Sequence, residues 1–255
     1  MIPDKTLLLD VGGTFLKCSD GRSIPMDSDG SREKIAGALR EAVSGYTRLR
    51  AAVPGPFDYA TGKFLMKHKF AAVYGEYFAD IAGLPRESCK FTHDVNCMLL
   101  GEIREDSANT AMIALGTGLG FALYVDGKIL KNALGSPQVS IFNLPFKDGV
   151  LEDYASKRGV YRLYGRDDLT VKEIGARAAA GEDAAQEAFA QMGSIIAQNI
   201  APILEEYAVQ ELLLGGQISR NWKFFAPAMQ EILPLVKIQP VSDFDNATFN
   251  GLSAI

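Results

Sequence analysis

The sequence is poor in several residue types, and each shortage excludes a class of protein. Only three cysteines occur among 255 residues, a sparse and odd number that does not predict a disulfide scaffold. The net charge is −5, and no run of Lys and Arg supplies the cluster that nucleic-acid binding needs. The first apolar stretch, in MIPDKTLLLDVGG, is too short for a signal-peptide core or a membrane span. We therefore expect a reduced, cytoplasmic protein that binds neither nucleic acid nor membrane.

The rest of the composition, 47% hydrophobic and 22% charged, is typical of a globular protein. Apolar runs of strand length alternate with segments of helical pattern along most of the chain. Thr170 and Glu173 have the spacing of a capping box, and helices are predicted over 183–207 and over 219–233. Because strands and helices alternate, the sequence predicts an α/β fold.

Two segments of the chain share one pattern. Residues 7–22 (LLLDVGGTFLKCSDGR) and 112–128 (MIALGTGLGFALYVDGK) both read as strand, glycine turn, strand and Asp-Gly hairpin turn. Aligning the two hairpin turns also aligns Gly12 with Gly118. The pattern predicts two similar halves, a chance match of short apolar segments being the alternative. Since a glycine turn lets backbone N–H groups approach an anion, two such turns indicate phosphate binding.

Two common phosphate motifs do not fit the chain. A P-loop requires a glycine five residues before Gly62-Lys63, and that residue is Phe57. The dinucleotide fingerprint G-x-G-x-x-G fits Gly116 and Gly118 but then meets Phe121. The sequence therefore supports neither a P-loop nor a Rossmann NAD site.

Six segments, in one order along the chain, resemble the motifs of a known superfamily. LDVGGT (9–14) and LGTGLG (115–120) resemble the two phosphate motifs of the sugar kinase, heat-shock ATPase and actin superfamily, and ELLLGGQIS (211–219) resembles its adenosine motif. VPGPFDYATGKF, HDVNCMLLGE and LEDYASKRG add a resemblance to the ROK family, whose name covers repressors, open reading frames and kinases. No helix-turn-helix segment precedes the first strand, which favours the kinases over the repressors.

The resemblance implies a duplicated actin-like ATPase fold, related to ribonuclease H, with two lobes around a central cleft. We expect the lobes at 1–107 and 108–255, and the last helix, about 246–255, to pack back on the first lobe. Dimers are common in the family, so a homodimer is implied as well.

The resemblance also implies ATP and Mg²⁺ as cofactors. It assigns Mg²⁺, held through water, to Asp10, for which a turn-stabilising Asx role is the alternative. It assigns phosphate to two glycine turns and adenosine to a third turn, where close packing alone is the alternative. The residues are Gly12, Gly13, Thr14, Gly116, Thr117 and Gly118 for phosphate, and Gly215 and Gly216 for adenosine.

Asp94 matches the family's catalytic base, which takes the proton of a sugar hydroxyl as that oxygen attacks the γ-phosphorus. By itself, an Asp just before a helix is a cap for free N–H groups. The two roles are compatible, because a carboxylate at a helix N-terminus is held in a fixed orientation. The resemblance thus implies an ATP-dependent kinase of a sugar or sugar derivative. The alternatives are a nucleotide- or sugar-binding sensor without activity, and a kinase of a non-sugar small molecule.

The acceptor side departs from the family's pattern. His93 replaces the usual Asn before the base. The E-x-G-H stretch, which contacts the sugar and contributes a zinc ligand, aligns with QVSI, so that Gln138 and Ile141 replace its Glu and His. Residues 132–160 contain no Cys or His, which excludes the family's structural zinc site. The sugar-binding residues that the resemblance implies are His93, Gln138, Gly55 and Glu152.

Glu152 and the basic stretch at 67–69 each have two interpretations. Glu152 has an alternative as an exposed residue at a helix start. Lys67, His68 and Lys69 follow the PGPFDYATG stretch, where the family often has an Asn near the sugar. A basic surface strand is the default interpretation, and an anionic acceptor, such as a sugar phosphate or a sugar acid, is the second hypothesis.

Overall fold

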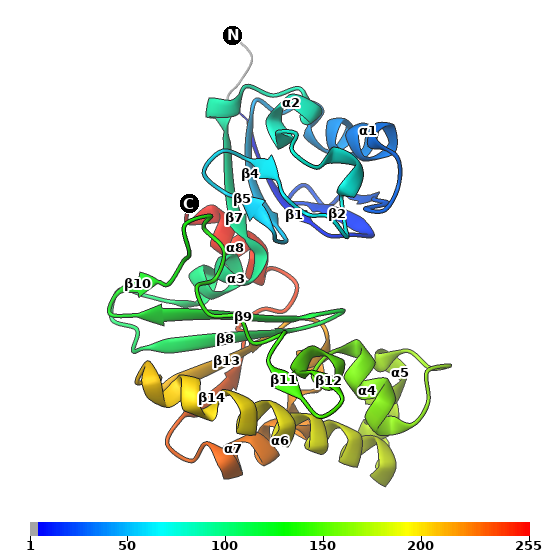
Figure 1. Ribbon diagram of the computed structural model, residues 1–255, viewed down its shortest axis with the longest axis vertical. Helices are drawn as coiled ribbons and strands as arrows, with labels where there is room; N and C mark the ends of the chain where they lie inside the picture. Colours follow the sequence, from blue (N-terminus) through cyan, green and yellow to red (C-terminus); the bar gives the residue numbers. More distant parts are fainter. Residues whose placement is uncertain (1–4) are drawn as a thin grey trace. The chain divides into compact units, whose positions relative to one another are not determined.

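The computed structural model describes residues 5–255. These residues form two compact units, and each unit is built on one five-stranded sheet (Figure 1). Each unit is assembled from segments far apart in the sequence. The first comprises the described part of Met1–Gly101 with Lys131–Pro137 and Asn246–Ile255, and the second comprises Glu102–Leu130 and Gln138–Asp245.

The sheet of the first unit has the strand order β3-β2-β1-β4-β7. Its central strands β1, β4 and β7 are parallel, and β2 and β3 continue the sheet as antiparallel hairpins. Alternate residues of β1 are buried, as a sheet with one face on a core requires. The strands are β1 (Thr6–Val11), β2 (Phe15–Cys18), β3 (Ser23–Pro25), β4 (Arg48–Val53) and β7 (Cys89–His93).

Aromatic packing orders the chain between β4 and β7. A short hairpin, β5 (Phe57–Asp58) and β6 (Lys63–Phe64), follows β4. The ring of Phe57 meets those of Phe64 and Phe91 edge-on, with centroids 5.2 and 5.3 Å apart. These contacts attach the hairpin to β7, whose last residue precedes Asp94.

The sheet of the second unit repeats the strand order of the first, as β10-β9-β8-β13-β14. Here too the three strands on one side are parallel and the two on the other form antiparallel hairpins. The α/β class and the two similar halves predicted from the sequence are confirmed. The strands are β8 (Thr110–Leu115), β9 (Leu119–Val125), β10 (Lys128–Ile129), β13 (Glu211–Gly215) and β14 (Lys237–Pro240), and a separate hairpin is formed by β11 (Pro145–Phe146) and β12 (Gly149–Val150).

The two glycine turns correspond in a different alignment from the one expected. Each turn spans three residues between two strands, 12–14 after β1 and 116–118 after β8. Gly12 therefore corresponds to Gly116, not to Gly118. The two Asp-Gly hairpin turns are separated by more residues than the two glycine turns are, because β9 has seven residues and β2 has four.

Helices pack on both sheets, and the last helix returns to the first unit. α8 packs on β1 and β4 (Figure 1). The guanidinium of Arg50 donates hydrogen bonds to the carbonyl oxygens of Leu252 and Ser253. The helices of the first unit are α1 (Arg32–Val43), α2 (Phe78–Ala82), α3 (Asp94–Glu102) and α8 (Ala247–Ser253). Those of the second are α4 (Lys157–Tyr164), α5 (Val171–Ala179), α6 (Asp183–Glu206) and α7 (Ala226–Ile232).

Local sequence accounts for two helix starts. Thr170 and Glu173 form the predicted capping box at α5, and α6 matches the long helix predicted over 183–207 to within one residue. The helix predicted over 219–233 is wrong in one respect, because it is broken at Phe225. Pro227 lies in the first turn of α7, where its missing N–H costs nothing, and a new helix starts there.

Among residues 5–255, no helix is both long enough and apolar enough to cross a membrane. Even α6, with 24 residues, does not combine the length and the apolar composition that crossing a bilayer requires.

Candidate active site

Three strand ends of the first sheet bring the two predicted functional carboxylates together. β1, β4 and β7 are parallel neighbours, and their registers pair Asp10 with Ala52 and Val53 with His93. Because parallel strands end at the same edge of a sheet, Asp10 lies on the same edge as the His93–Asp94 pair. The negative charge of Asp94 is close enough to raise the pKa of Asp10.

Asp10 is a carboxylate without a hydrogen-bond donor from residues 5–255, and it makes no Asx turn. Burial raises its pKa from 3.8 to about 6, with Lys17, its partner across the β1–β2 hairpin, opposing and Asp94 adding to the shift. A half-buried carboxylate whose ionisation is disfavoured gains stability from a nearby cation. The carboxylate oxygens of Asp10 are the type of ligand that a hard cation such as Mg²⁺ prefers, and the raised pKa means that a cation would favour the ionised form.

The first glycine turn is closed by its own backbone. The Gly12 N–H donates to the Phe15 carbonyl at 3.0 Å, and a Cβ on Gly12 would lie only 2.8 Å from that oxygen. The carbonyl groups of Gly13 and Thr14 accept hydrogen bonds from the N–H groups of Ser28 and Met26, which follow β3. No residue among 5–255 accepts from the N–H of Gly13 or Thr14, so these two donors are available to an anion.

The second glycine turn has the same arrangement of donors. The Gly116 N–H donates to the Gly118 carbonyl at 3.0 Å, and the Gly116 carbonyl accepts from the Lys157 N–H at 2.9 Å. Within the described chain, the N–H groups of Thr117 and Gly118 find no acceptor. In both turns the second and third residues thus offer their N–H groups, a correspondence that the residue types alone do not reveal.

Asp94 is the first residue of α3 and is held on one side. Its Oδ1 accepts from the Val95 N–H at 2.7 Å and lies 2.7 Å from His93 Nδ1. The same Val95 N–H also lies within hydrogen-bond reach of His93 Nδ1, at 3.3 Å. The other oxygen, Oδ2, accepts from none of residues 5–255, and 43% of the side chain is exposed. The carboxylate is therefore oriented by its contacts with Val95 and His93 and keeps one oxygen for a ligand.

The pKa of Asp94 lies below its ordinary value. Burial opposes ionisation, but the His93 imidazole, the Val95 N–H and the charge of Lys69 together outweigh it. The shift has the opposite sign to that of Asp10. One edge of the sheet thus carries an ionised carboxylate and a second whose ionisation is disfavoured.

Gly55 and Asn96 lie beside this pair. A Cβ built on Gly55 would be 3.4 Å from His93 Nε2 and 3.5 Å from Ser136 Oγ. Asn96, 1% exposed, donates from Nδ2 to the Gly135 carbonyl, and its Oδ1 is buried without a donor from residues 5–255. No sequence signal indicates that the segment Lys131–Pro137 lies beside Asn96, because only the fold brings this segment to α3.

The basic stretch at 67–69 is exposed, as the default interpretation expects, but it forms a bend and not a strand. The Lys67 ammonium lies over the Tyr74 ring, 5.5 Å from its centroid. Lys69 is the residue of this stretch whose charge reaches Asp94. A positive charge therefore stands near the predicted base.

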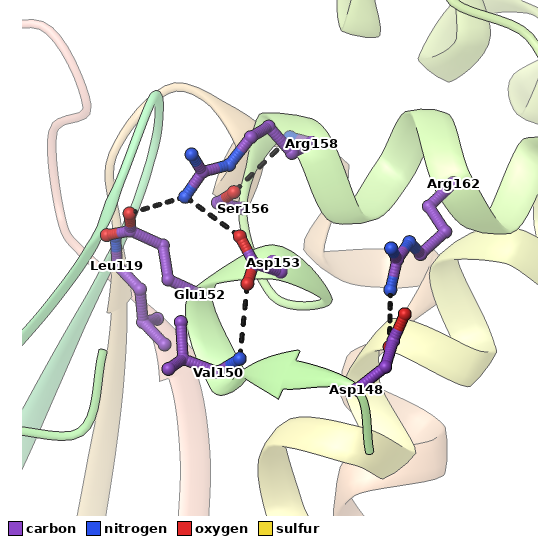
Figure 2. Close-up of polar contacts among 8 residues, drawn as sticks. All are labelled: Leu119, Asp148, Val150, Glu152, Asp153, Ser156, Arg158 and Arg162. Carbon is purple, nitrogen blue, oxygen red and sulfur yellow. Dashed lines mark hydrogen bonds and ion pairs between the residues drawn. The ribbon is translucent and has the colours of Figure 1, made fainter. Parts of the chain in front are cut away.

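Glu152 lies in a short helical segment, Leu151–Asp153, but it is only partly exposed and contacts the residue that follows the second glycine turn. Its Oε2 accepts from the Leu119 N–H at 3.0 Å, and its Oε1 accepts from Arg158 Nη2 at 2.8 Å (Figure 2). A Cβ on Gly118 would lie 2.8 Å from Oε2. The glycine at 118 therefore makes room for this carboxylate.

The predicted adenosine turn is tightly packed. Gly216 has φ +83°, and a Cβ there would lie 2.3 Å from the Leu115 carbonyl oxygen at the end of β8. The Ser219 hydroxyl donates to the Gly215 carbonyl at 2.6 Å. Close packing thus explains Gly216 by itself, and this turn lies beside the second glycine turn because β13 pairs with β8.

Gln138 and Ile141, which replace the Glu and His of the E-x-G-H stretch, lie in different environments. Gln138 is exposed, and its N–H donates to the Leu130 carbonyl. Ile141 is fully buried in the core of the second unit, where a metal-binding His would have no place. Residues 5–255 contain no group of three or more His, Cys, Asp or Glu side chains arranged to hold a metal ion.

Two units with the same strand order, each with a glycine turn after its first strand, define the actin-like ATPase fold. Comparison with solved structures agrees. A ROK family glucokinase from Streptomyces griseus, solved with glucose and AMPPNP, matches with a TM-score of 0.79, 18% identity and 98% coverage of both chains.

The sequence profile of the ROK family matches residues 32–246, and the chain belongs to this family. An N-acetyl-D-glucosamine kinase of Aliivibrio salmonicida is 28% identical over 216 residues, which cover 73% of this chain and 70% of that protein. An N-acetylmannosamine kinase of Salmonella paratyphi B is 25% identical over 247 residues, covering 84% and 83%.

Proposed function

We propose that the protein is an ATP-dependent kinase that transfers the γ-phosphoryl group to a hydroxyl of a sugar or sugar derivative. The observation that carries this proposal is the edge of the first sheet, where a glycine turn with two available N–H donors stands with two carboxylates of opposite pKa shift. The similarity to ROK sugar kinases over most of the chain supports it.

Asp94 acts as the general base in this proposal. Its lowered pKa keeps it ionised at neutral pH, and Oδ2 is the oxygen that accepts the proton of the acceptor hydroxyl. His93 and the Val95 N–H hold Oδ1, so the carboxylate cannot rotate away from the hydroxyl. Phosphoryl transfer demands positioning more than basicity, and this arrangement supplies it.

The remaining groups bind the nucleotide. The N–H groups of Gly13, Thr14, Thr117 and Gly118 are the donors that we assign to the phosphates. Mg²⁺ near Asp10, through water, would neutralise charge on the phosphate oxygens. The adenosine is assigned to the turn at Gly215–Gly216.

The acceptor is the least constrained part of the proposal. His93 and Gly55 lie at the Asp94 edge, and Glu152 lies at the second glycine turn. Gln138 is neutral where the family's sugar motif has a carboxylate, so the acceptor hydroxyls are contacted differently from those of the relatives. Lys69 near Asp94 keeps an anionic sugar derivative among the acceptors to be tried.

A coupled ADP-release assay tests the function. Purified protein is given ATP and Mg²⁺ with N-acetylglucosamine, N-acetylmannosamine, glucose, hexosamines, sugar acids and sugar phosphates in turn. The proposal expects at least one acceptor to release ADP in equal amounts with phosphorylated sugar. ATP binding without transfer to any member of the panel would favour the alternative of an inactive sensor. Transfer only to a non-sugar alcohol, tested alongside the sugars, would contradict the acceptor class.

A further inference from the structure

Glu152 and the second glycine turn are connected by a network that the predicted roles do not use (Figure 2). One carboxylate oxygen of Glu152 holds the N–H of Leu119, the residue directly after the turn, and the other holds Arg158. Leu119 is buried, so its N–H needs this acceptor. Glu152 thereby sets the exit of the turn into β9.

This arrangement places a negative charge where a phosphate is expected. The Glu152 side chain is 24% exposed and lies against Gly118, whose N–H is one of the available donors. A bare carboxylate at that distance would repel the phosphate of a nucleotide. The site therefore needs a charge that offsets Glu152 without occupying the turn.

Arg158 has the position to do this. Its backbone N–H donates to the Ser156 hydroxyl, which caps α4 and is completely buried, so the start of the side chain is fixed. From there Nη2 lies 2.8 Å from Glu152 and 3.2 Å from Asp153 Oδ1, while Asp153 Oδ2 accepts from the Val150 N–H. The guanidinium is thus shared by two carboxylates that are themselves attached to the backbone.

We propose that Arg158 is a positioning residue of the nucleotide site: it holds the Glu152 carboxylate on the Leu119 N–H and neutralises it, so that the glycine turn accepts phosphate. The role rests on the proposed function, which places phosphate at this turn. Arg158 acts through Glu152 and does not itself touch the nucleotide. With 60% of its side chain exposed, its ion pair is screened, so its removal costs nucleotide affinity rather than the fold.

The test measures ADP binding by titration calorimetry and backbone hydrogen exchange over 116–122 in the nucleotide-free protein. Arg158→Met should weaken ADP binding about fivefold, as loss of a screened ion pair implies, and should speed exchange in this segment. Arg158→Lys, which keeps the charge, should recover most of the affinity. The matched control is Arg162→Met, one turn further along α4, because Arg162 pairs with Asp148 at 3.1 Å and is 47% exposed (Figure 2). It should change neither measurement.

A double variant separates an indirect role from a direct one. In a Glu152→Gln background there is no carboxylate charge to offset, so adding Arg158→Met should change the ADP affinity by less than about twofold. If Arg158→Met instead caused the same loss in the wild-type and Glu152→Gln backgrounds, Arg158 would contact phosphate itself, and the proposal would be overturned. An Arg158→Met variant that behaves like Arg162→Met would overturn it too.

The same measurements separate this role from the kinase function. If the wild-type protein bound no ADP, the kinase function would fail as well. If the wild type bound ADP and turned over normally while Arg158→Met had no effect, only the role of Arg158 would fail.

Discussion

Replacing Asp10 with Asn should make the protein more stable at pH 7.5. In the folded protein the pKa of Asp10 is about 6, against 3.8 ordinarily, because burial disfavours its charge. The native state therefore binds more protons than the unfolded chain between about pH 4 and 6, and stability falls as the pH rises through that window. Above it, the ionised carboxylate costs up to about 3 kcal/mol, from the size of the shift at 1.36 kcal/mol per unit. Asn carries no charge and avoids this cost.

Urea unfolding followed by circular dichroism at pH 5 and pH 7.5 measures the effect. We expect Asp10→Asn to raise the free energy of unfolding at pH 7.5 by about 1–3 kcal/mol, with a smaller gain at pH 5. Asp20 is a control of opposite sign in the same unit. Burial opposes its ionisation, but the Arg22 N–H and the Tyr46 hydroxyl hold its pKa below the ordinary value, so Asp20→Asn should destabilise at pH 7.5.

A loss of stability in Asp10→Asn at pH 7.5 would refute the reasoning, because it would mean that the carboxylate is satisfied by the protein. A gain accompanied by loss of kinase activity would fit a carboxylate retained for function at the expense of stability.

Two further predictions concern the turns and the base. Gly216→Ala should lower the free energy of unfolding by about 2–4 kcal/mol, because Gly216 has a positive φ and the added Cβ would collide with the Leu115 carbonyl. Gly116→Ala is the control and should cost less than about 1 kcal/mol, because its Cβ would meet no atom within 4 Å. Equal losses of the two variants in chemical denaturation would contradict the packing argument. His93→Asn removes the imidazole that favours ionised Asp94, so the acid limb of the pH profile of kcat/KM should move to higher pH. An unmoved limb would show that His93 does not tune the base.

The elements of the fold follow closely from local sequence signals. The apolar run before each glycine turn, the Asp-Gly hairpins and the capping box at Thr170 are signals of a few neighbouring residues, and each acts where it is expected. The alignment of the two turns was wrong by two residues because the pattern does not reveal strand length, and β9 is longer than β2. The apolar pattern of residues 219–233 runs on through Phe225 and Pro227, so it does not reveal the break at Phe225.

The sequence motifs predict which residues form the candidate site, but they do not predict which of these residues contact one another. Asp10 and Asp94 were expected on family resemblance, and their opposite pKa shifts depend on burial and on His93, which no motif encodes. Glu152 was assigned from a matching motif, but its hydrogen bond to Leu119 joins residues far apart in sequence. The sequence does not single out Arg158, because an Arg at a helix start is usually a solvated residue. Only its two carboxylate partners, Glu152 and Asp153, distinguish it.

The rate of phosphoryl transfer by Asp94→Asn tests the central claim most directly. With an acceptor identified in the panel, we expect kcat to fall by about 10²–10⁴-fold, because the proton acceptor is lost, while ATP affinity stays within about threefold of wild type. Asp80→Asn, which removes a carboxylate paired with Arg86 at the surface of the same unit, should leave kcat unchanged. An Asp94→Asn protein with wild-type turnover would contradict the account, since another group would then be the base.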